Sequence, residues 1–124
     1  MEVNKENMRL WVAGLLSGKF IQGRNQLSYT DEFDVKKYCC LGVACETAIS
    51  NGLKVEVKQT YENFTFDGEE NVLPLSVMDW LGIDKDDPVL GTLDNYRIIA
   101  TTANDDMNWD FEEIADELEK YYKL

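Results

Sequence analysis

The sequence predicts one compact domain of the α+β class, with about five helices around a central buried helix at residues 39–51 and a small antiparallel sheet. Three observations predict this class. Residues 38–52 have no strongly charged face, several other segments carry apolar residues at helical spacing, and residues 53–58 alternate between apolar and polar side chains. The chain of 124 residues has an ordinary length for one domain, so we expect a single unit over residues 1–124.

The central helix is predicted from apolar residues that cover most of a helical circumference, a pattern typical of a helix enclosed by other elements. These residues are Leu41, Val43, Ala44, Cys45, Ala48 and Ile49. We expect Asn51 and Gly52 to end the helix, because glycine readily adopts the left-handed conformation found after a helix C-terminus.

A first helix is predicted from Asn4, which can cap it, to about Leu16. Its buried stripe, at positions i, i+3, i+4 and i+7, is Met8, Trp11, Val12 and Leu15.

Between the first helix and the central one, residues 19–22 and 27–29 are predicted to form two short strands. Residues 23–25, Gly-Arg-Asn, are the expected loop of that hairpin. Residues 31–37 are expected to be a polar loop.

After the central helix, residues 53–58 predict a strand with one exposed face, and Asp67-Gly68 predicts a turn. Residues 74–81 predict a short helix, because Pro74 is tolerated in a first helical turn and Gly82 can close the helix. Its expected buried residues are Val77, Trp80 and Leu81.

The last third of the chain predicts two more helices. Residues 92–103 carry apolar residues at helical spacing, and we interpret them as a helix, although residues 97–102 are β-branched enough to form a strand. Asp110 and Glu113 have the spacing of a capping box, which predicts a final helix over residues 110–124.

Composition excludes several classes of function. The chain has no histidine, which removes Ser-His-Asp triads, Cys-His dyads and histidine zinc sites. Residues 1–61 carry a net charge of +1 and residues 62–124 carry −13, so nucleic acid is an improbable partner. The acidic clusters lack the spacing of a calcium loop, and we expect neither a metal site nor a cofactor.

Location is predicted from missing signals. No apolar run is long enough for a bilayer, and residues 1–10 lack the apolar region of a signal peptide. The sequence therefore predicts a soluble, cytoplasmic protein.

Four ordered motifs resemble those of a family of small proteins from tailed bacteriophages and prophages. The first is W-x3-L-x-SGKF-x-QG at residues 11–23, and the second is YCCLGVACE at residues 38–46. The others are LP-x2-V-x2-WLG at residues 73–82 and Asn104-Asp105 followed by FEEIAD at residues 111–116. Relatives of this kind tend to have a glycine soon after the Asn-Asp pair, where this chain has Met107, Asn108 and Trp109.

The resemblance implies an accessory protein that acts against host defence in the bacterial cytoplasm. Our first hypothesis is a sponge that binds a nucleotide-derived immune signal, such as a cyclic or modified ADP-ribose, without catalysis. The alternative is a protein that binds and inhibits a host defence component through its acidic surface, with DNA mimicry as one form of this. An enzyme acting through Asp or Cys is the third hypothesis, and a homo-oligomer with sites at its interface is compatible with the first.

For a nucleotide ligand, the start of the central helix is the expected binding site, because unpaired N–H groups there attract phosphate. We expect Lys19, Arg24 and Lys37 to contact phosphate and Tyr38 to stack on the base. The expected polar readers of base and ribose are Gln22, Asn104 and Asp105. The structural alternative is a hairpin with ordinary surface cations and an Asn-Asp turn.

The adjacent cysteines Cys39 and Cys40 lie at the same predicted helix start, where the helix dipole would lower a thiol pKa. The alternative, which we favour, is that all three cysteines of the chain are buried packing residues.

Overall fold

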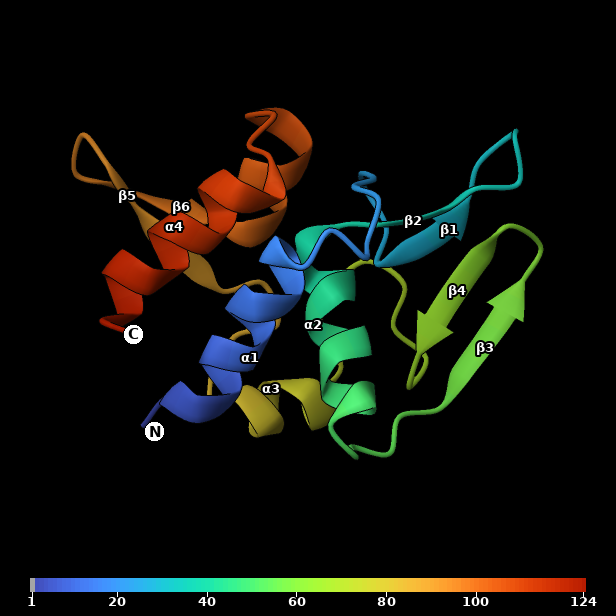
Figure 1. Ribbon diagram of the computed structural model, residues 1–124, viewed down its shortest axis with the longest axis horizontal. Helices are drawn as coiled ribbons and strands as arrows, with labels where there is room; N and C mark the ends of the chain where they lie inside the picture. The colour runs from blue at the N-terminus through green and yellow to red at the C-terminus, as the bar shows by residue number, and fades with distance from the viewer. Residues whose placement is uncertain (1) are drawn as a thin grey trace.

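The computed structural model describes residues 2–124 and has an α+β fold, as predicted. Within that range five helical segments and six strands follow one another (Figure 1). In chain order they are α1 (Lys5–Leu16), β1 (Ser28–Thr30), β2 (Lys36–Tyr38), α2 (Cys40–Ser50), β3 (Val57–Thr60), β4 (Asn63–Phe66), α3 (Leu75–Leu81), β5 (Val89–Leu93), β6 (Tyr96–Ile99), the π-helix η1 (Thr102–Asp106) and α4 (Phe111–Tyr122).

Helix α2 is the predicted central helix, and it lies between α1 on one side and the larger sheet on the other (Figure 1). Its residues from Cys40 to Cys45 are all buried. Gly42 allows the closest approach, because a Cβ at this position would overlap the carbonyl oxygen of Leu27. The chain entering β1 therefore packs directly on the helix backbone, and a larger residue at position 42 would force the two apart.

Helix α1 confirms the predicted cap and stripe. The Asn4 side chain accepts a hydrogen bond from the Asn7 N–H at 3.0 Å. The buried residues of the helix are Met8, Trp11, Val12 and Leu15. Trp11 also donates its indole N–H to the carbonyl oxygen of Cys40 at 2.9 Å, which satisfies the polar atom of a fully buried ring and ties α1 to α2.

The predicted hairpin of residues 19–22 and 27–29 is wrong. Strand β1 pairs instead with β2, in a segment that we expected to be a loop, and on its other edge with β4. The turn between β1 and β2 is closed by Asp31, whose Oδ1 accepts the N–H groups of Phe33 and Val35 at 2.9 Å each. Gln22 contributes only a parallel bridge to Tyr38.

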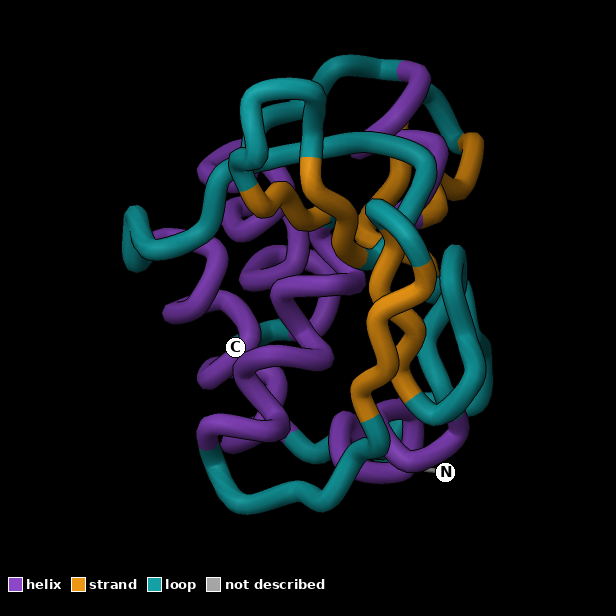
Figure 2. Tube along the Cα trace, turned by 90° about the vertical axis from the view of Figure 1, so that its right-hand side faces the viewer, coloured by secondary structure: helices purple, strands orange, loops and turns teal. Residues whose placement is uncertain are grey.

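The larger sheet is antiparallel, in the order β2-β1-β4-β3, and stands beside the helices (Figure 2). The strand predicted at residues 53–58 begins only at Val57, and the Glu56 N–H just before it donates to the Asp67 side chain at 2.8 Å. The expected single exposed face is wrong, because all four residues of β3 are exposed. A tight turn follows at Tyr61, a residue that has a φ of 56° and is 95% exposed. The predicted turn at Asp67-Gly68 is confirmed, and both residues have positive φ.

The predicted helix over residues 92–103 is wrong for its first eight residues, which belong to the β5–β6 hairpin or to its turn. Asp94 and Asn95 form that turn with φ angles of 50° and 70°, the conformation of a two-residue turn that matches strand twist. The alternative strand at residues 97–102 is correct up to Ile99. Helical structure starts only at Ala100, with α-helical geometry at Ala100 and Thr101, and continues as the π-helix η1.

Helices α3 and α4 confirm the two remaining predictions. Gly82 closes α3 with a φ of 73°, and Val77 and Leu81 are buried as expected, whereas Trp80 is half-buried. Asp110 and Glu113 form the predicted capping box of α4. The buried residues of α4 are Phe111, Ile114, Ala115 and Leu118.

Helices α1 and α4 pack against each other in opposite directions, as the ribbon shows (Figure 1). The Lys5 ammonium group donates to the Lys123 carbonyl oxygen at 3.4 Å, so the start of α1 lies beside the end of α4. In the described part of the chain, no helix is long and apolar enough to cross a membrane.

Candidate functional site

The N-terminus of α2, where we expected a phosphate, is occupied by the side chain of Asn104. The Cys40 N–H donates to Asn104 Oδ1 at 3.1 Å, although the two residues are 64 positions apart. Asn104 is 1% exposed. A buried helix start needs such a partner, because its first N–H groups have no acceptor within the helix.

All the hydrogen-bonding capacity of the Asn104 amide is used. Its Oδ1 also accepts from Gln22 Nε2 at 2.9 Å, while its Nδ2 donates to the Gly23 carbonyl oxygen and to Asp105 Oδ1, both at 2.8 Å. Gln22 Nε2 additionally donates to the Trp109 carbonyl oxygen at 2.8 Å. Asp105 Oδ1 accepts the N–H of Asn25 at 3.0 Å. We call this set of contacts the Asn104 network.

The structure therefore brings Gln22, Asn104 and Asp105 together, as the site hypothesis required, but they bind one another and the backbone. The π-helix η1 supplies both Asn104 and Asp105. Its wider turn is held at the start by Asp87, whose carboxylate accepts from both the hydroxyl and the N–H of Thr101. The loop after η1 contains Asn108 with a φ of 57°, a left-handed position that asparagine tolerates and glycine prefers.

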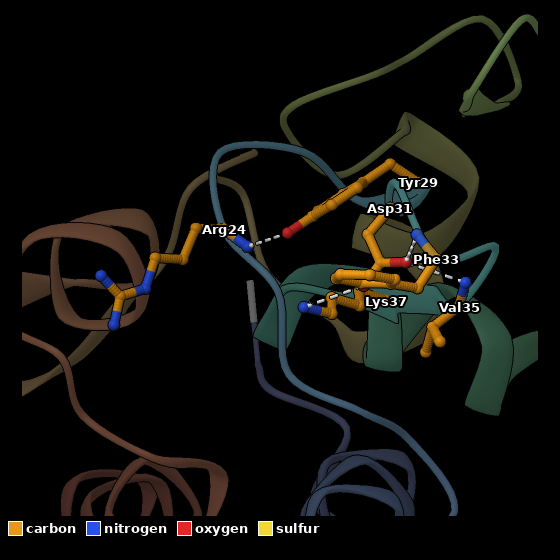
Figure 3. A network of polar contacts seen from close by, with 6 residues as sticks. All are labelled: Arg24, Tyr29, Asp31, Phe33, Val35 and Lys37. Atoms are coloured by element: carbon orange, nitrogen blue, oxygen red, sulfur yellow. Dashed lines mark hydrogen bonds and ion pairs between the residues drawn. The ribbon is translucent and has the colours of Figure 1, made fainter.

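The three expected cations do not converge. Lys37 forms an ion pair with Asp31 at 3.3 Å, and hydrogen bonds from Val35 and Phe33 together with Lys37 lower the pKa of Asp31. Arg24 is exposed and extends away from that cluster, while its backbone N–H donates to the Tyr29 hydroxyl at 3.3 Å (Figure 3). Lys19 lines a hollow of about 220 Å³ beside the C-terminal half of α2.

Tyr38 belongs to the core, being only 9% exposed. Its ring meets Phe20 edge to face, with the centroids 5.0 Å apart. The Lys36 ammonium group lies 5.4 Å from the Tyr38 centroid and 4.1 Å from that of Phe64, a pair of cation–π contacts that sequence reasoning missed. A base would have to displace core side chains in order to stack on Tyr38.

The cysteines are buried thiols. Burial raises the pKa of Cys39 to about 12, and the N–H groups of Gly42 and Leu41 offset this only in part. Burial likewise raises the pKa of Cys40 and of Cys45 well above the ordinary value. The lowered pKa expected at the helix start is therefore wrong, because removal of water outweighs the helix dipole.

Another hollow lies on α4, at the seam where Leu16 of α1 meets that helix. It has a volume of about 560 Å³ and is lined mainly by acidic residues of α4 and its cap. Its lining residues are Leu16, Asp110, Glu112, Glu113, Ala115, Asp116 and Glu119. We call it the acidic groove. The sequence indicated the outward acidic face of α4, but the groove depends on how α1 packs beside it.

Charge in the acidic groove is only partly compensated. Lys120 pairs with Asp116 at 3.2 Å and approaches Glu117 at 3.9 Å. Among residues 2–124, the other carboxylates of the groove make no ion pair. Within the same described range, no three Cys, Asp or Glu side chains are arranged to hold a metal ion.

A family model for a domain of unknown function, DUF8296, matches residues 3–122. The chain belongs to this DUF8296 family. No curated protein and no solved structure gives a significant match. Because the family match assigns no function, the function has to be inferred from the residues of this chain.

We expect Asn104→Ala to lower the free energy of unfolding by about 2–4 kcal/mol, because the Cys40 N–H and the Gly23 carbonyl group lose their buried partner. Chemical denaturation measures the change. Asp106→Ala, an exposed site on the same π-helix, is the control and should change stability by less than about 0.5 kcal/mol. Equal stability of Asn104→Ala and the native DUF8296 domain would contradict a structural role for the network.

We also expect the three thiols to resist alkylation in the folded DUF8296 domain near neutral pH, because burial raises their pKa values and excludes the reagent. Mass spectrometry after a timed exposure to iodoacetamide measures this, and denatured protein provides the fully labelled control. Rapid labelling of Cys39 in the native state would revive the nucleophile hypothesis.

Proposed function

We propose that this DUF8296 protein is a non-catalytic binding protein that holds a basic partner protein at the acidic groove. The observation that carries this proposal is the groove itself, which combines a hollow of about 560 Å³ with carboxylates that lack ion pairs among the described residues. A concave surface of one charge attracts and orients an oppositely charged partner. The resemblance to phage proteins suggests a component of host defence as that partner.

Glu119 supports a binding role over a purely structural one. Acidic residues in the first turn, such as Glu112 and Glu113, stabilise a helix because they face the positive end of its dipole. Glu119 lies near the other end of α4, where the dipole disfavours a negative charge. Its presence in the groove is therefore not explained by helix stability, whereas contact with a cationic partner accounts for it.

The charge variant Glu112→Gln with Glu119→Gln tests this proposal. We expect it to fold normally, because one change removes a favourable dipole contact and the other an unfavourable one. Capture of a partner from bacterial lysate should fall roughly fivefold or more relative to the native protein, since each exposed ion pair contributes up to about 1 kcal/mol. High salt should weaken capture in the same direction.

The matched control carries the same loss of charge on the sheet side, Glu62→Gln with Glu69→Gln, where both side chains are exposed. It should capture the partner as the native protein does. If both double variants behave alike, overall charge and not the acidic groove governs binding, and the proposal fails.

Sequestration of a nucleotide signal is our second proposal, and one observation favours it. Arg24 is exposed beside the Asn104 network and makes no ion pair among residues 2–124. Calorimetry with ADP-ribose derivatives and cyclic dinucleotides should then show binding without turnover, weakened in Arg24→Ala. Titrations without heat across these compounds would remove this proposal and leave the acidic groove unaffected.

A further inference from the structure

A second hollow extends the acidic groove along the same seam. It has a volume of about 280 Å³ and shares Leu16 and Glu119 with the acidic groove. Its other lining residues are Arg9, Val12, Ala13 and Leu124. The two hollows are therefore neighbours, the first lined mainly by α4 and the second mainly by α1, and we call them together the α1–α4 channel.

The chemistry changes along the channel. The end near the start of α4 is dominated by carboxylates, whereas the second hollow has mostly aliphatic walls. Leu16 lies where the two meet, and its side chain is 52% exposed. An occupant that matches this surface needs cationic groups along one side and aliphatic groups along another.

We infer that the α1–α4 channel binds one basic amphipathic helix of a partner protein, an inference that rests on the proposed function. Such a helix places Leu or Ile side chains at positions i, i+3, i+4 and i+7 against Leu16 and the second hollow, and Lys or Arg side chains against the acidic rim. Helix α4 has 12 residues, so a partner helix of similar length spans the seam.

The negative charge of the channel disfavours three other occupants, namely a second copy of this chain, a nucleic acid and an anionic membrane. A second copy of this chain brings a net charge of −12, and its own acidic groove would face like charge. Nucleic acid and anionic membranes are repelled for the same reason. Of these occupants, a basic amphipathic helix matches both the carboxylates and the exposed aliphatic residues, with Arg9 the one cation among the lining residues.

The test uses a synthetic peptide of about 14 Lys and Leu residues with the leucines at helical spacing, titrated into the intact protein. A peptide of identical composition, scrambled so that no apolar face forms, is its control. We expect the patterned peptide to bind about tenfold more tightly than the scrambled one, because only its leucines reach Leu16 together. NMR shift changes should follow α1 and α4.

Two protein variants locate the contact. Leu16→Ser should weaken binding of the patterned peptide about tenfold, whereas Leu75→Ser, at a leucine of α3 that is 68% exposed, should leave it unchanged. Circular dichroism checks that both variants fold. Equal binding of the two peptides, or equal effects of the two variants, overturns the helix inference. The proposed function is tested separately, and it fails if the groove and control charge variants capture the partner alike.

Discussion

The buried amide of Asn104 is the contact on which the arrangement of this fold depends. Helix α2 is enclosed, so its first N–H group needs a partner from the protein, and Asn104 supplies one from a segment 64 residues away. The same amide binds Gln22 and the carbonyl oxygen of Gly23. One side chain thus joins the start of the central helix, the loop before β1 and the π-helix that leads to α4.

This constraint bears directly on function. Polar groups that resemble a ligand site by residue type are here engaged with one another, and Tyr38 is packed into the core. The uneven charge of the chain then becomes the dominant feature of its surface. Most of the negative charge lies in the second half of the sequence, and α4 presents part of it beside α1 as a groove with an exposed aliphatic wall.

The structure brings together three of the seven residues that the sequence suggested for a ligand site, and it separates the cations among them. Gln22, Asn104 and Asp105 lie together because Asn104 accepts the Cys40 N–H at the start of α2 and its amide binds the other two side chains. Lys19 and Lys37 could not be placed, since their positions depend on a hollow between α1 and α2 and on the turn at Asp31. The acidic groove was beyond prediction for a similar reason, because it exists only where two distant helices pack.

What the sequence alone determined were the elements with local signals: α1 with the Asn4 cap, α3 with its closing Gly82, and α4 with the Asp110–Glu113 capping box. Such signals act within about four residues, so they can be recognised without knowing the fold. Tertiary structure decided the pairing of β1 with β2 and β4 and the strand conformation of residues 96–99. Strand pairing takes its free energy from partners far along the chain, and a short β-branched segment therefore becomes helix or strand according to what lies beside it.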